Sequence, residues 1–267
     1  GFKGSWFTIL LLKLGSEVCG YSLEPKTKED LFYKIYPHIS KDIEHNIGDI
    51  RDEKRLKNLV NQYQPDFIFH FAAQPLVIES YIDPISTWNT NVIGSLNLLE
   101  SMKSIDKKCS LVVITTDKVY LNKEWDFGYR ENDTLGGFDP YSSSKAALEI
   151  LLNSWRLSFS SQYKNLSLAS ARAGNVIGGG DWSENRIIPD AIRALKSDQN
   201  IRVRNPNATR PWQHVLEPLV GYLMQAEKMY ESPDNYESSF NFGPFTNSNR
   251  KVSELVNQIL RVWEGNW

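Results

Sequence analysis

The sequence predicts an α/β fold built on a doubly wound parallel sheet, since strand-like apolar runs alternate with helical patterns. The runs at 66–71 and 110–115 are largely apolar, as expected of parallel strands that are covered on both faces. Short polar motifs follow several of these strands directly. Because ligands bind beyond the carboxyl ends of the strands in such sheets, the pattern also predicts a site along that edge.

Near the beginning of the chain, residues 7–15 predict a buried helix that ends at Gly15, and residues 17–23 predict a strand. A second short strand is expected to end within 46–50. A helix over 52–63 follows, and the Asp at its first position is a residue type that favours helix N-termini.

Further along, two long helices are expected over 84–104 and 139–160, the second with a Pro in its first turn. A strand at 166–171 continues the alternation, and an amphipathic helix at 252–262 comes last. Helices alternating with parallel strands in this way are typical of a Rossmann-like sheet.

After residue 180 the pattern loosens into short helices and loops rich in Pro, Asn and Arg, which indicates a smaller ligand-binding lobe. We expect a sheet domain over 1–175 and an interleaved lobe over 176–267. Gly1 and Gly4 resemble the back half of a glycine-rich phosphate turn, so we expect a truncated chain that lacks its first strand and its last part. The sheet would then have a gap at its middle, and the chain alone is expected to be unstable or inactive.

Composition excludes several classes of protein. The chain has 267 residues, 41% of them apolar and 23% charged, as in an ordinary soluble domain, and its net charge of −2 gives no basic field for nucleic acid. The longest apolar run, 7–12, is too short to span a membrane. Cys19 and Cys109 lie in apolar runs, so we expect both to be packing residues. Two such cysteines do not suggest a disulfide framework, which agrees with a reducing cytoplasm. No metal-ligand spacing is present among the histidines, and His70 is expected to be a core residue.

Tyr141 and Lys145 stand one helical turn apart, so both fall on one face of the expected helix. The ammonium group favours the phenolate and should lower the pKa of Tyr141 from its usual value of about 10 toward neutrality. Such a phenolate can take a proton from a sugar hydroxyl while hydride leaves the same carbon. The alternative is a partly exposed helix face on which this spacing has no catalytic meaning.

Thr116, Asp117 and Lys118 follow a buried strand directly. Thr116 can hold a sugar hydroxyl beside Tyr141. Asp117 and Lys118 supply a carboxyl and an amine, one to protonate a leaving hydroxyl and the other to deprotonate the neighbouring carbon. The alternative is a solvated pair of charges in a loop.

Several residues at strand and helix ends are suited to a dinucleotide. The first turn of the helix after Gly1 and Gly4 can hold a pyrophosphate with its backbone N–H groups. Asp49 can accept from an adenine amino group with Ile50 against the ring, although it can equally serve a turn or a helix cap. Ala72 and its neighbour Ala73 are small enough for a phosphate or ribose to approach, although ordinary tight packing also explains them.

A second group of residues predicts a nucleotide diphosphate site. Arginine recognises phosphate through paired hydrogen bonds, whereas single surface arginines are usually solvated. The segments 205–206 and 210–214 add amides and aromatic rings suited to a base, beside the glycines at 178–180. The polar members of this group are Arg172, Asn175, Arg186, Arg202, Arg204 and Arg210.

Together these motifs resemble the extended short-chain dehydrogenase/reductase family over essentially the whole chain. The resemblance rests on the segments 1–6, 48–52, 72–77, 90–94, 116–118, 139–145, 172–182 and 210–215. Within the family they are similar to the nucleotide-sugar 4,6-dehydratases. Lys118 and the segment 210–215 favour the type that acts on CDP-glucose, because the dTDP-glucose and GDP-mannose types carry Glu after the Asp.

The resemblance implies a tightly held NAD and a cycle of C4 oxidation, loss of water across C5 and C6, and hydride return to C6, giving CDP-4-keto-6-deoxyglucose. Tyr141, assisted by Thr116 and Lys145, would serve the first step. In the second step Lys118 would assist removal of the C5 proton while Asp117 protonates the departing C6 hydroxyl. It implies cofactor contacts from Gly1, Phe2, Gly4, Asp49, Ile50, Phe71, Ala72, Ala73, Gln74, Asn91, Thr115, Tyr141, Lys145 and Arg172. It implies substrate contacts from Gln74, Asn175, Arg186, Arg204, Asn205, Arg210, Trp212 and His214.

The family resemblance also implies a homo-oligomer, dimer or tetramer, that associates through the helices at 84–104 and 139–160, and a role in making dideoxysugars for surface polysaccharides such as O-antigen. Three rival functions stay open. A nucleotide-sugar C4 epimerase needs the Tyr141/Lys145 pair but no acid/base pair for water loss. A non-catalytic NAD-binding protein needs neither pair. Another nucleotide-hexose 4,6-dehydratase is a third possibility.

Overall fold

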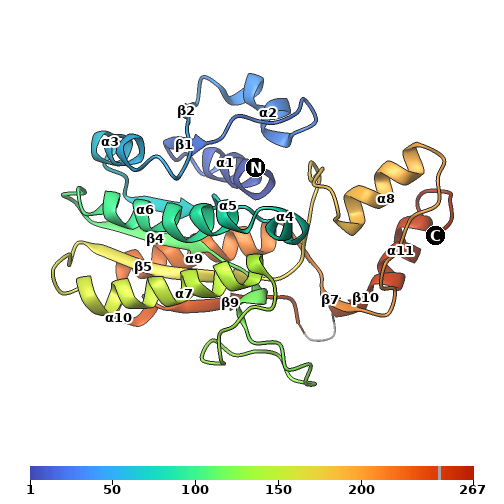
Figure 1. Cartoon of the computed structure of the whole chain (residues 1–267). Coiled ribbons are helices and arrows are strands. Elements are labelled where there is room, and N and C mark those ends of the chain that lie inside the picture. The colour runs from blue at the N-terminus through green and yellow to red at the C-terminus, as the bar shows by residue number, and fades with distance from the viewer. Residues whose placement is uncertain (246–247) are drawn as a thin grey trace.

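Four parallel strands in the order β3-β4-β5-β9 form the main sheet of the computed structural model, which describes residues 1–245 and 248–267 (Figure 1). The strands are β3 (Phe67–His70), β4 (Cys109–Ile114), β5 (Leu166–Ala173) and β9 (Ser239–Phe242). The predicted parallel α/β fold is therefore confirmed.

Helices cover both faces of this sheet. Alternate residues of β4 point to opposite faces and join different cores. Leu111 and Val113 join the core under three helices, and Val112 and Ile114 join the core under two others. The first set comprises α3 (Glu53–Tyr63), α6 (Gly94–Met102) and α7 (Pro140–Phe159), and the second comprises α1 (Phe2–Lys13) and α9 (Leu216–Glu231).

The strands β1 (Val18–Ser22) and β2 (Ile43–Ile47) form a separate parallel pair, with α2 (Leu31–Ile39) between them in the chain. Among the described residues no ladder joins this pair to β3. The expected gap in the sheet is therefore present, and Phe67 of β3 is 40% exposed rather than covered on both faces.

Local sequence explains where the long helices begin. Asp52 and Asp139 accept backbone N–H groups of the first turns of α3 and α7, at 3.1 and 2.9 Å, as N-cap residues do. The helix expected over 84–104 is present as three consecutive parts with a π-helical middle, namely α5 (Pro84–Trp88), η1 (Asn89–Ile93) and α6. A further short helix, α4 (Val77–Ile82), was not predicted.

The region after residue 180 is more regular than predicted. Helix α9 has 16 residues and β9 extends the main sheet, so the expectation of short helices and loops alone is wrong. Pro218 and Gly221 weaken the helical pattern of α9, but Leu219 and Tyr222 are fully buried against the sheet and override that preference. The boundary at residue 175 stays a prediction, because α9 and β9 return to the sheet domain.

The segments 187–196, 209–211 and 249–260 lie to one side of the sheet (Figure 1). Helices α8 (Ile187–Lys196) and α11 (Val252–Leu260) share a small apolar core. The other elements are the 3-10 turn η2 (Asp117–Val119), α10 (Pro233–Tyr236), the parallel pair β6 (Val176–Ile177) and β8 (Gln213–His214), and the antiparallel pair β7 (Thr209–Pro211) and β10 (Asn249–Lys251). None of the helices in the described ranges is long and apolar enough to cross a membrane.

Candidate active site

The carboxyl ends of β3, β4 and β5 bring the predicted motifs to one edge of the sheet. His70 pairs with Val113, and Ile114 pairs with Ala171, so the three strands end side by side. The loop 72–75 follows β3, η2 follows β4, and residues 174–175 follow β5. The edge predicted to carry a site therefore does carry the polar motifs.

Tyr141 and Lys145 lie on the inward face of α7, where they are 8% and 4% exposed. The Lys145 ammonium donates to the Ile114 carbonyl oxygen at 3.2 Å, at the end of β4. The Thr116 hydroxyl, which follows β4, interacts with the Tyr141 phenol. The structure therefore brings together the three residues predicted for proton abstraction.

The electrostatics of this pair differ from the prediction. Burial raises the pKa of Tyr141 to about 12, and the Thr116 hydroxyl only partly opposes the rise. Burial also lowers the pKa of Lys145 to about 8, with Lys3 lowering it further and Glu149 opposing. The expectation that Lys145 lowers the pKa of Tyr141 is wrong for the ligand-free protein, because loss of water around the phenolate outweighs every nearby charge.

Asp117 and Lys118 form an ion pair at the mouth of the site, with Lys118 Nζ 3.2 Å from Asp117 Oδ1. Their side chains are 37% and 42% exposed, so a ligand can reach both. The Thr116 hydroxyl donates to the same carboxylate oxygen at 3.0 Å. Gly174 at the end of β5 faces this carboxylate, and a Cβ added there would lie 3.1 Å from Asp117 Oδ2.

Lys3 also belongs to this site, although it was not predicted. Burial lowers its pKa to about 8, and its charged neighbours are Arg186, Asp117 and Lys118. The sequence does contain a signal for Lys3, because this residue lies between the two glycines at the start of α1. A cation beside a helix N-terminus suits a phosphate.

The N-terminus of α1 fits a dinucleotide phosphate. Gly1 provides no side-chain cap, so the first N–H groups of this helix are not satisfied by a capping side chain. The Trp6 indole donates to the Gly179 carbonyl oxygen at 2.8 Å, which places the glycines at 178–180 beside the helix start. Phe2 contacts Gly178, where a Cβ would lie only 3.1 Å from its ring.

Other residues predicted to touch the cofactor have internal partners. Asn91 is fully buried and joins the loop after β3 to α7, accepting from Gln74 N–H at 2.8 Å and donating to Ser144 Oγ at 2.9 Å. The Gln74 side chain donates to Thr87 Oγ1 at 2.9 Å. Phe71 packs in the core against Phe7. Their cofactor contacts stay predictions.

Asp49, Ile50 and Arg172 lie in surroundings different from those expected. Asp49 forms an ion pair with Arg51 at 2.6 Å, and Ile50 is 9% exposed within the core. Arg172 is 4% exposed and pairs with Glu149 at 2.7 Å, so it does not join an arginine cluster. His70 is the core histidine that was expected, since it is 5% exposed and lies 2.7 Å from Ser95 Oγ.

Three of the predicted substrate residues, Asn175, Arg186 and Arg204, lie in the chain between the end of β5 and β7. Asn175 Oδ1 is buried without a hydrogen-bond partner, as a ligand-binding acceptor would be. Arg186 pairs with Asp181 at 2.8 Å and lies close enough to Tyr141 to influence its pKa. The Arg204 guanidinium donates to the Asn185 carbonyl oxygen at 3.0 Å.

The other predicted substrate residues lie further out. Asn205 and Arg210 are exposed, and the Trp212 indole donates to the Arg250 carbonyl oxygen at 3.3 Å. The His214 ring packs edge-on against Trp6, with ring centroids 6.0 Å apart. The described residues contain no group of His, Cys, Asp or Glu side chains that could hold a metal ion.

A parallel sheet edge that carries a buried Tyr-Lys pair beside an uncapped helix N-terminus is the arrangement of an extended short-chain dehydrogenase/reductase. The chain belongs to the GDP-mannose 4,6-dehydratase family, whose profile matches residues 1–258.

Individual relatives agree with this family. The chain is 43% identical to the CDP-glucose 4,6-dehydratase of Salmonella typhimurium over 267 residues, covering 98% of this chain and 74% of that protein. Its fold resembles the UDP-glucose 4-epimerase of Thermotoga maritima, with a TM-score of 0.83, 22% identity, and coverage of 98% and 79% of the two chains. It also resembles a dTDP-glucose 4,6-dehydratase of Streptomyces venezuelae solved with NAD, with a TM-score of 0.82, 21% identity, and coverage of 100% and 80%.

Proposed function

We propose that this protein catalyses the NAD-dependent 4,6-dehydration of CDP-glucose, giving CDP-4-keto-6-deoxyglucose and water. The observation that carries the proposal is the Asp117–Lys118 ion pair beside the buried Tyr141 phenol, since water loss needs an acid and a base in addition to the redox pair. Similarity to a CDP-glucose 4,6-dehydratase supports the choice of nucleotide.

The residues at the sheet edge fit NAD. The uncapped N-terminus of α1 and the Lys3 ammonium suit its phosphates, and Lys145 suits a ribose beside Tyr141. NAD, when bound, accepts a hydride from C4 of the sugar and later supplies one to C6. The protein must therefore hold first C4 and then C6 of the sugar beside the bound NAD.

Tyr141 removes the proton of the C4 hydroxyl, and Thr116 holds that hydroxyl in place. Because burial keeps the pKa of Tyr141 at about 12, the phenolate needs positive charge from its surroundings, and Arg186 supplies part of it. The 4-ketone formed in this step makes the proton on C5 acidic.

Lys118 then takes the C5 proton, while Asp117 protonates the C6 hydroxyl as it leaves as water. These roles require a neutral amine and a protonated carboxyl. Lys118 Nζ and Asp117 Oδ1 lie 3.2 Å apart, so both groups can reach the same part of the sugar. The free Asn175 Oδ1 and the Arg186 guanidinium bind the nucleotide part of the substrate.

The test is to incubate the purified protein with NAD⁺ and, separately, CDP-glucose, dTDP-glucose and GDP-mannose, and to follow loss of water by mass spectrometry. Water loss from CDP-glucose alone is expected. Isomerisation of a sugar without water loss would establish a C4 epimerase instead. Binding of NAD⁺ without any change in a sugar would establish a non-catalytic protein.

We also propose that the protein is a homo-oligomer that associates through α4, α5 and α7. These helices carry large apolar side chains that are well exposed: Tyr81 64%, Ile82 71%, Ile85 74%, Ile150 61% and Leu157 80%. Exposed apolar surface of this kind marks a contact between chains. Light scattering should give a dimer or tetramer, and Ile150→Glu with Leu157→Glu should give monomers.

A cytoplasmic location is part of the same proposal. Cys19 and Cys109 are free thiols, and burial raises the pKa of Cys109 to about 12, so this thiol stays unreactive. Fractionation of the source cells followed by detection with an antibody would test the location.

A further inference from the structure

Glu149 is a buried carboxylate that none of the proposed steps uses. It is 2% exposed and lies one helical turn beyond Lys145, on the face of α7 that meets the sheet. Its partner is Arg172 of β5, whose Nη2 donates at 2.7 Å. Because burying two charges is costly, such a pair needs further hydrogen bonds to be tolerated.

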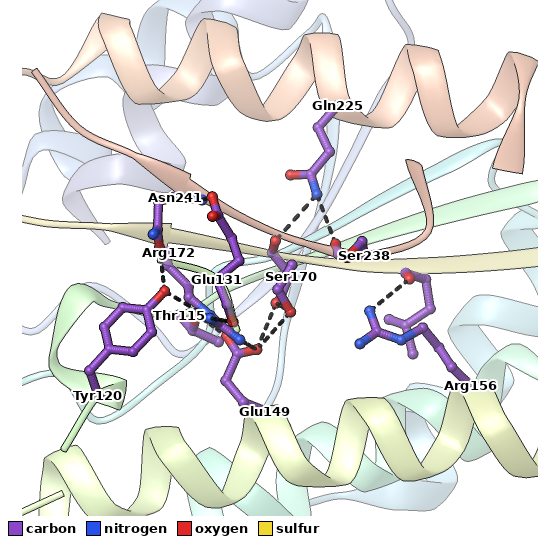
Figure 2. A network of polar contacts seen from close by, with 12 residues as sticks. Thr115, Tyr120, Glu131, Glu149, Arg156, Ser170, Arg172, Gln225, Ser238 and Asn241 are labelled. Atoms are coloured by element: carbon purple, nitrogen blue, oxygen red, sulfur yellow. Dashed lines mark hydrogen bonds and ion pairs between the residues drawn. The ribbon is translucent and has the colours of Figure 1, made fainter. Parts of the chain in front are cut away.

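The Glu149 carboxylate binds groups from three neighbouring strands (Figure 2). Thr115, directly after β4, donates its hydroxyl to Oε1 at 2.5 Å. The hydroxyls of Ser170 on β5 and Ser239 on β9 donate to Oε2 at 2.8 and 3.1 Å. Glu149 therefore connects α7, which carries Tyr141 and Lys145, to the strands of the sheet.

Arg172 extends the same network to the segment that follows Lys118. Its Nη1 donates to Tyr120 OH at 2.8 Å and to the Glu131 carbonyl oxygen at 2.9 Å (Figure 2). Tyr120 OH in turn donates to Asn241 Oδ1 at 2.6 Å. Since Thr115 and Tyr120 flank residues 116–118, the ion pair holds both ends of the segment that carries Asp117 and Lys118.

We propose that the Glu149–Arg172 ion pair is a positioning device for the reaction, which sets segment 116–118 against Tyr141 and Lys145. Neither residue touches the substrate, and both act through the groups that they hold. The catalytic meaning of this inference rests on the proposed function, whereas the coupling of the two segments rests on the network alone.

Glu149 also influences the charge of Lys145. The charged groups that face this ammonium are Lys3 from α1, which lowers its pKa, and Glu149, which raises it. His70 from β3 is neutral, because burial lowers its pKa to about 3. Replacing Glu149 by Gln should therefore lower the pKa of Lys145 and move the alkaline limb of the kcat–pH profile to lower pH.

The decisive variant is Glu149→Met with Arg172→Met, because removing both charges avoids an unpaired buried ion. We expect it to fold, to exchange amide hydrogens faster in residues 115–121, and to lose about 100-fold in kcat with KM little changed, as a small misplacement does. The matched control is Lys228→Met with Glu231→Met, an exposed ion pair of α9, which should change none of these measurements.

If the double variant does not fold, Thr115→Val removes one hydroxyl of the network, and Thr27→Val, an exposed change outside the network, is the control. Faster exchange at 116–121 and lower kcat are expected for the first and not for the second. A folded double variant, or Thr115→Val, with wild-type exchange and kcat would overturn the proposal. If the wild type does not dehydrate CDP-glucose, the proposed function fails, but hydrogen exchange still decides whether the pair positions these segments.

Discussion

Replacing Lys145 by Met is expected to stabilise the ligand-free protein at neutral pH. Burial lowers the pKa of Lys145 from 10.5 to about 8, so the unfolded chain binds this proton more tightly. Between about pH 8 and 10.5 the unfolded state carries more protons, and the free energy of unfolding therefore rises with pH in that window. Below about pH 8 the full penalty remains, roughly 3 kcal/mol for a shift of this size.

The substitution also removes the hydrogen bond from Nζ to the Ile114 carbonyl oxygen at 3.2 Å. That loss costs about 1 kcal/mol, so the net gain at neutral pH is about 2 kcal/mol. Lys3 adds to the rise in stability with pH, and the raised pKa values of Cys19 and Cys109 oppose it above about pH 9, so the quantity to follow is the gain of the variant over the wild type, which should shrink as pH rises.

Urea unfolding at several values between about pH 7 and 10 measures both effects. The upper limit of about pH 10 avoids the titration of Tyr141. Because the pKa of Tyr141 is raised to about 12 in the folded protein, the free energy of unfolding falls as pH rises beyond about 10. Lys54→Met, an exposed change on α3, is the matched control. It should alter neither the free energy of unfolding at neutral pH nor the change of that free energy with pH. A Lys145→Met protein that is less stable at neutral pH and keeps the wild-type slope would refute the reasoning.

Asp117→Asn and Lys118→Met should each lower the rate of dehydration by about 10²–10⁴-fold but still permit oxidation at C4. NADH absorbance in a single turnover measures that oxidation. Loss of the absorbance as well would contradict separate roles for the two steps. Asn91→Ala should lower the free energy of unfolding by about 2–3 kcal/mol, measured by thermal melting, because it leaves buried polar groups without their partner, whereas a change near zero would contradict this. Gly174→Ala places a methyl group 2.9 Å from the Pro211 ring and 3.1 Å from the Asp117 carboxylate and should lower kcat about tenfold, while Gly128→Ala, with nothing within 4 Å, should not.

The strands and the catalytic motifs were predictable because local patterns determine them. The apolar run of β4 and the Asp139 cap of α7 need only neighbouring residues for their interpretation. The positions of Tyr141 and Thr116 at one edge follow from parallel topology, which places all carboxyl ends together.

Long-range partners were not predictable. Nothing in the residues near Arg172 indicates Glu149 as its partner, since the pairing needs the packing of α7 on β5. The pKa of Tyr141 depends on burial, which spacing along a helix does not reveal. Helix α9 was missed because its helicity comes from contacts with the sheet more than from its own residues.

Burial and nearby charges together determine the ionisation of the side chains at this site. Lys3, Lys118 and Arg186 gather near one carboxylate, that of Asp117. Burial is the main cause of the lowered pKa values of Lys3 and Lys145, and nearby positive charge lowers both further. The same positive charge favours an anionic ligand. Burial raises the pKa of the Tyr141 phenol to about 12, so Tyr141 keeps its proton at neutral pH.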